Sequence, residues 1–411
     1  MNLSKIKIFW LLFLIKFAEA NILYDVLKQR TGDPCENLYR HTCPLGVNRT
    51  ISQELEKSIN PILQKFDETQ DAVRKTYSFL KIDNIQRIIE SAIESMTFIK
   101  ICEKFNLTKG VQYLENILEQ TKKVMIEDIK NTNWLLKHNQ TDIAIRVIEK
   151  IYLTFDSKNQ EKVKFFFKDF ENCFNSCLKD FPNSTEVCVT HGYECAAKHN
   201  FTWIDLIKTA NGVNEHNKII NFGISFILYA SQTQDEVLKV ALIASLMAHE
   251  LSHTMMNSIT ASNDNILSYF PPKAEDCITK QYESTCKTYK EIKCFMTFRQ
   301  LEEAGADVIG MNLAYKLFKN IINQSASESI LKKLNLSNID QLFFLTYWSI
   351  LCRPEKITTT EMKDHPANNI RINAVVQLPE FQKSFNCSAD STMMKSRTDQ
   401  CLIYGKKSKF K

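Results

Sequence analysis

Three observations predict a mainly α-helical fold with a small β component, an α+β chain. Glycine and proline number only 9 each in 411 residues, and a chain with few helix-breaking residues favours helices over a loop-rich β architecture. Apolar residues in the segment 52–130 recur at helical spacing, for example Leu55, Ile59 and Ile62. Strand-like runs are confined to short stretches between residues 146 and 229. The length leaves room for two or three domains.

The first half of the chain is expected to begin with amphipathic helices over residues 52–130. Residues 146–155 and 162–168 are then expected to form the two strands of a β-hairpin, because the polar residues 156–159 between them are typical of a tight turn. Residues 171–200 are dense in cysteine and predict a loop region stapled by disulfides.

The second half is expected to open with one strand and then to become helical. A turn at Asn211-Gly212 precedes the apolar, β-branched run 218–229, which predicts a strand. Thr233 and Glu236 have the spacing of a capping box, so a helix is expected to start there. Its residues 237–248 are almost continuously apolar, which predicts a buried helix.

The strongest motif of the chain, His249-Glu250-Leu251-Ser252-His253, lies at the end of that helix. Residues four apart lie on one face of a helix, so both imidazoles can bind one ion. Glu250 then lies beside the ion without binding it and is placed to take a proton from water. Two buried histidines beside a glutamate cost free energy unless a partner satisfies them, and a zinc ion would do so.

A catalytic zinc needs a third protein ligand and one open position for water. Glu303 and Asp307 are four residues apart on a second predicted helix, so one could bind the ion while the other orients a ligand histidine. Gly305 and Gly310 lie in the same helix, where each glycine costs about 1 kcal/mol relative to alanine. Close approach of this helix to the first would explain why glycine is kept there.

The compartment is predicted from the N-terminus and the cysteines. Residues 1–20 are typical of a signal peptide, with an uncleaved signal anchor as the alternative. No later segment is long and apolar enough to span a membrane. The 13 cysteines fit an oxidising compartment, and their odd number leaves one free thiol or an intermolecular bridge. Together with the acceptor sequons for N-glycosylation they predict a secreted glycoprotein. These sequons are at Asn48, Asn106, Asn139, Asn183, Asn200, Asn323, Asn335 and Asn386.

The charge of the chain argues against a nucleic-acid-binding protein. The formal net charge is +5, but four lysines lie in the last six residues and three more lie in the predicted signal. The body between them is close to neutral, whereas a nucleic-acid interface needs a basic face.

At this point the motifs resemble those of the neprilysin and endothelin-converting-enzyme family of zinc metallopeptidases. Separate stretches match in order over about residues 33–105 and 205–404. They are Asp33-Pro34-Cys35-Glu36-Asn37-Leu38-Tyr39 with Cys43, His249 to His253, Cys277-Ile278-Thr279-Lys280-Gln281-Tyr282, Glu303 to Gly310 with Ala314-Tyr315, Gln341-Leu342-Phe343-Phe344-Leu345 with Trp348 and Cys352, and Asp364-His365-Pro366-Ala367 with Arg371, Asn373 and Pro379-Glu380-Phe381 through Cys387. The resemblance implies a thermolysin-like zincin catalytic domain.

The resemblance also implies domains and roles. Between the signal peptide predicted over 1–20 and a basic tail over 405–411, it implies a reduced helical domain over 21–205 and a catalytic domain over 206–404. One zinc ion per chain would be held by His249, His253 and Glu303. Glu250 would be the general base, Asp307 would orient a ligand imidazole, His365 and Arg371 would bind the substrate carbonyl and the developing oxyanion, and Asn214 would hydrogen-bond the substrate backbone.

The family also implies three disulfides, Cys35–Cys387, Cys43–Cys352 and Cys277–Cys401. Cys102 would pair with one of Cys173, Cys177, Cys188 or Cys195, and Cys286 with Cys294 would form a local bridge. Long-range bridges of this kind stabilise a fold by constraining the unfolded chain.

Two departures from the family pattern bear on activity. Glu215-His216 replaces the usual residues after Asn214, and Met256 stands where the family has an acidic partner for the second zinc histidine. The sequence thus predicts a secreted zinc metalloendopeptidase acting on peptides. A catalytically weak or inactive relative that binds a peptide or receptor is the alternative, and a glycoprotein stapled by zinc, with Cys294 as fourth ligand, is a third.

Overall fold

The computed structural model describes residues 23–43, 50–76, 86–204, 212–214, 219–255, 272–289, 297–322, 327–352 and 365–405. The expected signal peptide, most of the basic tail, Asn48, Asn323, Glu215-His216, Met256 and Cys294 lie outside these residues. The predicted fold class is confirmed, because the described chain is mainly α-helical with one small sheet. Among the described helices, none combines the length and the apolar composition that a membrane span requires.

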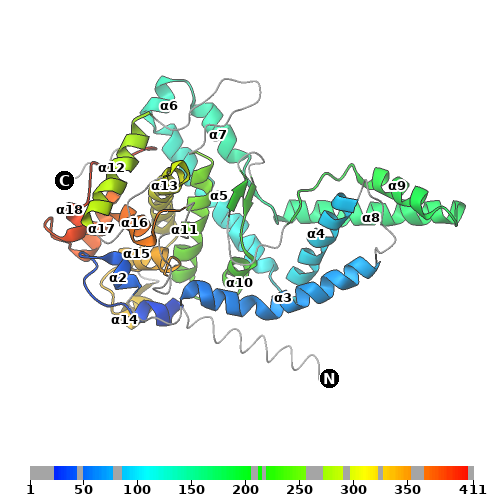
Figure 1. Cartoon of the computed structure of the whole chain (residues 1–411), viewed down its shortest axis with the longest axis horizontal. Helices are drawn as coiled ribbons and strands as arrows, with labels where there is room; N and C mark the ends of the chain where they lie inside the picture. The colour runs from blue at the N-terminus through cyan, green and yellow to red at the C-terminus, as the bar shows by residue number, and fades with distance from the viewer. Residues whose placement is uncertain are drawn as a thin grey trace.

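Figure 1 shows the elements in space. The first half contains α2 (Leu38–Thr42), α3 (Ile51–Thr76), α4 (Gln86–Lys104), α5 (Thr108–Lys130), α6 (Asn133–Lys137), α7 (Thr141–Glu149), β1 (Tyr152–Leu153), α8 (Ser157–Asp180) and α9 (Thr185–Ala196). The second half contains β2 (Gly212–Asn214), β3 (Ile219–Asn221), α10 (Ile224–Gln232), α11 (Glu236–His253), α12 (Pro272–Thr288), α13 (Phe298–Ile321), α14 (Glu328–Leu334), α15 (Ile339–Ser349), α16 (Asn368–Ile372), a 3₁₀ helix η2 (Asn373–Gln377), α17 (Pro379–Phe385) and α18 (Thr392–Lys395).

The sheet has three short strands in the order β1-β3-β2. β1 pairs with β3 in parallel, with Tyr152 opposite Ile219. β2 pairs with β3 antiparallel, with Asn214 opposite Ile219, so β2 is an edge strand of this sheet. β2 also contacts α11, and the edge therefore lies beside the helix that carries the two-histidine motif.

The expected β-hairpin is wrong. Residues 141–149 form helix α7, and only Tyr152–Leu153 is a strand. The polar turn is the start of a helix, because the Asp156 carboxylate accepts a hydrogen bond from the Asn159 N–H at 2.6 Å and caps α8. Val163, Phe167 and Phe170 of α8 are buried and recur at helical spacing, so one face of the helix is directed toward the protein interior.

The cysteine-rich segment is also helical rather than a loop. α8 and α9 lie antiparallel and extend to one side of the molecule (Figure 1). The disulfides Cys173–Cys195 and Cys177–Cys188 join the two helices. Cys173 and Cys177 are four apart on α8 and therefore share the face that meets α9.

The expected bridge from Cys102 to this cluster does not form. Cys102 lies on α4, is buried, and has a free thiol. The four cysteines of α8 and α9 pair among themselves and leave no partner for it. Cys286 is disulfide-bonded, while its expected partner Cys294 lies outside the described residues.

The strand predicted over 218–229 is confined to β3, and the rest is helix α10. Nearly all of α10 is buried, so its apolar run has no polar face that could reveal a helical period. Gly110 of α5 allows α10 to approach closely, because a Cβ there would overlap with the Ile227 carbonyl oxygen. α11 begins at Asp235, whose carboxylate accepts from the Val237 and Leu238 N–H groups, and not at the expected capping box of Thr233.

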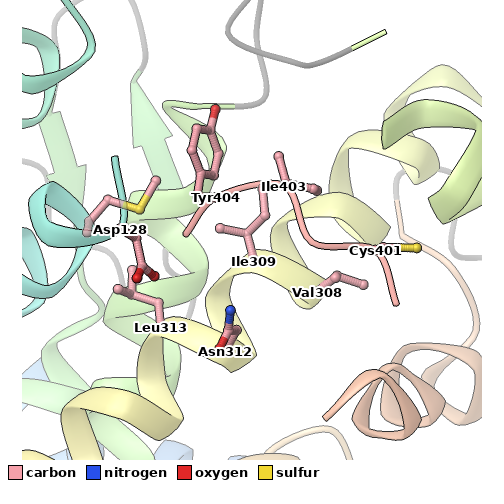
Figure 2. Close-up of a pocket in the computed structure, with 9 residues that line it drawn as sticks. Asp128, Val308, Ile309, Asn312, Leu313, Cys401, Ile403 and Tyr404 are labelled. Carbon is pink, nitrogen blue, oxygen red and sulfur yellow. The ribbon is translucent and has the colours of Figure 1, made fainter. Parts of the chain in front are cut away.

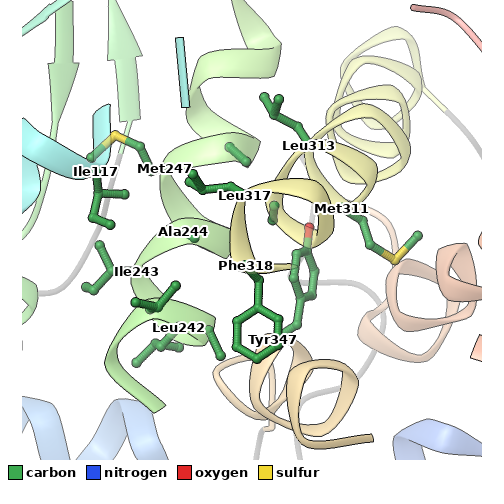
Figure 3. Close-up of a cluster of buried hydrophobic side chains, with 14 of the residues drawn as sticks. Ile117, Leu242, Ile243, Ala244, Met247, Met311, Leu313, Leu317, Phe318 and Tyr347 are labelled. Atoms are coloured by element: carbon green, nitrogen blue, oxygen red, sulfur yellow. The ribbon is translucent and has the colours of Figure 1, made fainter. Parts of the chain in front are cut away.

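The core is centred on the packing of α11 against α13, the most extensive helix contact in the described chain. Figure 3 shows Ala244 of α11 on the side of Leu317 and Phe318 of α13, while Ile243 and Met247 extend from the other side of α11 toward Ile117. The two helices approach very closely at Gly310, where a Cβ would lie 2.8 Å from His249 Cα. The expected reason for a glycine in this helix is therefore present at Gly310. One core cluster runs from Leu23 to Tyr404 and joins both halves of the chain, while α8 and α9 contribute to a second, smaller cluster.

Three long-range disulfides agree with those that the family resemblance implied. Cys35–Cys387, Cys43–Cys352 and Cys277–Cys401 span 352, 309 and 124 residues. Beyond Cys401 the chain crosses between α5 and α13, where Figure 2 shows Ile403 and Tyr404 at a small pocket that Asp128 and Asn312 also line. The N- and C-terminal ends of the described chain are thereby fixed to one core.

Replacing Gly310 by alanine should lower the free energy of unfolding. The new methyl group would meet backbone atoms of His249, which cannot move aside as the end of a side chain can. Overpacking typically costs about 1–3 kcal/mol, whereas a glycine-to-alanine change in an exposed helix stabilises by about 1 kcal/mol. Urea denaturation would measure the change. Asn320→Ala, at an exposed position of the same helix, reports helix propensity alone, and a stabilised Gly310→Ala protein would contradict the close approach.

Candidate metal centre

The last turn of α11 carries the first half of the site. His249, Glu250 and His253 lie at its C-terminal end, and the first two are buried. The helical spacing directs both imidazoles to one side, and their Nε2 atoms are 3.1 Å apart. Two ring nitrogens at this distance are aimed at a common point.

Glu303 reaches the same point from α13. Its Oε2 atom lies 3.3 Å from His249 Nε2, and its Oε1 atom lies 3.5 Å from His253 Nε2. One donor atom from each of the three residues lies within 4.8 Å of the others. α13 begins at a capping box in which Thr297 and Gln300 bond each other's backbone N–H groups. This Thr-x-x-Gln spacing is a sequence signal that could have located the start of the helix.

Asp307, one turn further along α13, lies behind the first histidine. Its Oδ1 atom is 3.0 Å from His249 Nδ1, on the side of the ring opposite the metal-facing nitrogen. Arg371 of α16 binds the same carboxylate in two places, from Nε at 2.8 Å and from Nη2 at 2.9 Å. Such paired hydrogen bonds fix both position and orientation. The contact of Arg371 with Asp307 was not predicted from the sequence, where the residues are 64 positions apart.

His365 completes the cluster. Its Nε2 atom lies 3.1 Å from Glu303 Oε2, and Arg371 Nη2 lies 3.7 Å from the same oxygen. The structure therefore brings together the candidate residues of α11, α13 and the segment that leads into α16. Asn214 is placed by its backbone on the edge strand β2 beside α11.

The charges of the site shift each other's titration in the metal-free protein. Burial alone would lower the pKa of His249, but the carboxylates of Asp307 and Glu303 outweigh it and raise that pKa to about 10. Burial, reinforced by the charge on His249, lowers the pKa of His253 to about 4. Burial opposes ionisation of Glu303 as well, yet the neighbouring imidazoles of His249 and His365 hold its pKa well below the usual range. Near neutral pH, His253 is therefore neutral, while His249 is protonated and lies next to the carboxylates.

Glu250 has a different environment although it adjoins the same cluster. Burial raises its pKa to about 7, and the Glu303 charge acts in the same direction while the cationic neighbours oppose it. A carboxyl group with this pKa is poised to gain or lose a proton near neutral pH.

The donor set fits a divalent metal ion. Glu303 Oε2 is buried and makes no properly oriented hydrogen bond within the described part of the chain, although two imidazole nitrogens lie 3.1 and 3.3 Å away. A buried acceptor without a hydrogen bond is destabilising unless another group satisfies it. Two imidazole nitrogens and one carboxylate oxygen form the donor set of zinc sites that keep a fourth position open.

Part of the chain is similar to known peptidases. Residues 214–401 match the model of peptidase family M13. Neprilysin of Homo sapiens is 25% identical over 307 residues, which cover 68% of this chain and 40% of neprilysin. Neprilysin of Mus musculus is 23% identical over 317 residues, 71% of this chain and 42% of the relative. The chain therefore spans about 40% of the length of these curated relatives.

The matched region begins at Asn214, contains every element that carries the cluster of His249, Glu303 and Arg371, and ends at Cys401. The family predicted from the ordered motifs is confirmed for the matched region: residues 214–401 match peptidase family M13, and the chain is similar to neprilysin.

Proposed function

We propose that the chain is a secreted zinc-dependent metalloendopeptidase that hydrolyses peptide bonds. The observation that carries the proposal is the convergence of His249 Nε2, His253 Nε2 and Glu303 on one point, with Glu250 beside them and outside the ligand set. Membership of a peptidase family supports the reaction class.

One zinc ion would be held by His249, His253 and Glu303. When bound, it supplies a Lewis acid for the scissile carbonyl and for the attacking water. Asp307 Oδ1 lies 3.0 Å from His249 Nδ1, and this ion pair would hold that imidazole with its Nε2 atom toward the ion. Arg371 in turn holds Asp307, so the ligand is oriented through two successive contacts.

Glu250 is the proton carrier of the proposed reaction. Its pKa of about 7 lets the carboxylate take a proton from water as the water attacks the carbonyl carbon. The same carboxyl group then delivers the proton to the amine that leaves. A group whose pKa lies near the working pH performs both transfers without a large free-energy penalty in either direction.

His365 and Arg371 would stabilise the negative charge that develops on the carbonyl oxygen. Both donors lie on the Glu303 side of the cluster, at 3.1 and 3.7 Å from Glu303 Oε2. Arg371 uses Nε and Nη2 on Asp307, which leaves Nη1 as the nitrogen that we assign to a substrate carbonyl. Removing one such donor typically costs about 3 kcal/mol of transition-state stabilisation.

The substrate would bind as an extended peptide beside α11. β2 is an edge strand of the described sheet and ends at Asn214, so a peptide can add to it through main-chain hydrogen bonds. We assign Asn214 to the substrate backbone.

Secretion is supported by the covalent structure. Five disulfides join pairs of described cysteines, and disulfides persist in oxidising compartments. Six of the eight predicted glycosylation sites lie in the described residues, and every one of them is exposed. They are Asn106, Asn139, Asn183, Asn200, Asn335 and Asn386. An uncleaved anchor in residues 1–20 is the alternative to release.

The change Glu250→Gln should abolish peptide hydrolysis while zinc is retained. Glutamine has nearly the same shape but cannot accept the proton, and general acid–base catalysis contributes about 10²–10⁴-fold. A peptide-library digest measures cleavage, and metal analysis of the purified protein measures zinc.

The same comparison separates the enzyme from a peptide-binding or receptor-binding relative. Wild-type protein that holds one zinc per chain and cleaves nothing would contradict the proposal. Binding of peptides that is equal in wild type and Glu250→Gln, without hydrolysis in either, would favour the binding protein instead.

Zinc binding to the metal-free protein should release about one proton at pH 8. His249 is protonated at that pH because its pKa is about 10, whereas a ligand nitrogen must be unprotonated. His253, with a pKa of about 4, is already neutral, and Glu250, with a pKa of about 7, is mostly ionised. The zinc association constant should therefore rise about tenfold per pH unit near pH 8.

Calorimetric titration of zinc in buffers with different ionisation enthalpies measures this proton release. At pH 6 the number of protons released per zinc ion should be higher than at pH 8, because zinc also favours ionisation of Glu250. The Glu250→Gln variant should lose only this additional release. Zinc uptake without proton release at pH 8 would show that His249 is not the protonated ligand.

A further inference from the structure

The side chain of Gln300 joins two segments of the site. It lies on the first turn of α13, three residues before Glu303, and is 9% exposed. Its Oε1 atom accepts a hydrogen bond from the Thr297 backbone N–H at 3.0 Å. Its Nε2 atom donates to the backbone carbonyl of His365 at 3.1 Å, a residue 65 positions away. Both ends of one amide are therefore used, one by the helix start and one by the substrate-facing segment.

His365 is thereby held to α13 at two points. Gln300 holds its main chain, and Glu303 Oε2 lies 3.1 Å from its imidazole. Gln300 and Glu303 are three residues apart, so both face the same side of the helix. Two contacts to one rigid helix fix the direction from the His365 backbone to its ring.

Burial does not fix this histidine. The His365 side chain is 40% exposed, unlike those of His249 and His253, which are 11% and 12% exposed. After it, Asn368 donates to the Leu351 carbonyl at 2.7 Å and holds the start of α16. Within the described residues, the bond from Gln300 is the hydrogen bond that the His365 main chain itself makes.

We infer that Gln300 is a positioning residue that holds His365 where the tetrahedral charge develops, an inference that rests on the proposed function. A displacement of about 1 Å at a reacting group can cost about 100-fold in rate. Gln300 does not touch the substrate, and it acts through the placement of the His365 ring.

The choice of glutamine supports this role. Glutamate at the same position completes a capping box equally well and also interacts favourably with the helix dipole. Capping alone therefore does not require an amide. What glutamate lacks is a donor for the His365 carbonyl, and its charge would repel that oxygen.

Three variants separate the two roles of Gln300. Gln300→Glu keeps the capping acceptor and loses the donor. Gln300→Met loses both without adding charge. Thr297→Ala, the matched control, weakens the cap and keeps the amide that bonds His365.

The test compares two zinc-directed probes on the zinc-loaded full chain. A phosphinic peptide presents a tetrahedral anion to His365 and the metal, whereas a mercaptoacyl peptide of the same sequence binds the metal through sulfur. Gln300→Glu and Gln300→Met should weaken the phosphinic peptide about tenfold and the thiol peptide less than twofold. They should also lower kcat about tenfold with little change in KM. Thr297→Ala should lower the melting temperature and leave the ratio of the two affinities at the wild-type value.

Hydrogen exchange supplies a readout that needs neither zinc nor activity. In both Gln300 variants the amides of residues 365–372 should exchange faster, while Gln300→Glu leaves the first turn of α13 protected. An unchanged affinity ratio together with unchanged exchange in both variants overturns the inference. Wild-type protein that binds no zinc or cleaves no peptide contradicts the proposed function instead, and the exchange data still decide the role of Gln300.

Discussion

The metal ligands lie on two helices, so the site depends on how closely α11 and α13 approach. The contact point is Gly310, whose Cα faces the backbone of His249 itself. A side chain there would push the helix of Glu303 and Asp307 away from both histidines, and donor distances of 3.0–3.5 Å leave little room for such a shift. Buried Leu, Ile, Met and Phe side chains of α11 and α13 belong to the same hydrophobic core (Figure 3). The hydrophobic packing and the chemistry of the site therefore depend on one close helix contact.

That contact also buries charge, and the arrangement of partners follows from the need to compensate it. Asp307 is 1% exposed, and a lone buried carboxylate would be strongly destabilising. It is compensated by a guanidinium on one side and by an imidazole on the other. Arg371 therefore holds Asp307, and Asp307 holds His249. Glu250 forms no ion pair with a described residue, so burial outweighs the charge on His249 and raises the pKa of Glu250 to about 7. Two acidic side chains of one cluster thus have opposite protonation behaviour because their neighbours differ.

The helical parts of the site could be predicted because they depend on local spacing. A four-residue interval fixes the relation of His249 to His253 and of Glu303 to Asp307 whatever the rest of the fold does. Contacts between segments that are far apart in the sequence could not be predicted in this way. The bonds from Arg371 to Asp307 and from Gln300 to His365 link residues 64 and 65 positions apart. The predicted hairpin failed for a different reason. Phe165, Phe166 and Phe167 favour a strand individually, but Asp156 caps a helix and the interior-facing aromatic residues recur at the helical period. The disulfides of α8 and α9 likewise require that helical geometry, which the cysteine count alone does not contain.

The C-terminal end of the described chain holds the end of α11 that carries the two histidines. The Tyr404 hydroxyl donates to the Met255 carbonyl at 3.3 Å, two residues beyond His253, and the Tyr404 ring packs against Trp134. Trp134 also donates to the Ile403 carbonyl at 2.9 Å, so this segment is held on both its side chain and its backbone. Cys401 anchors it to α12 through Cys277, and the Cys401 N–H donates to Gln377. The helix of the two histidines thus has its start fixed by Asp235 and its end fixed by residues more than 140 positions away. The polar bonds at the two ends of α11 therefore act together with the close contact at Gly310 to place His249 and His253 relative to Glu303.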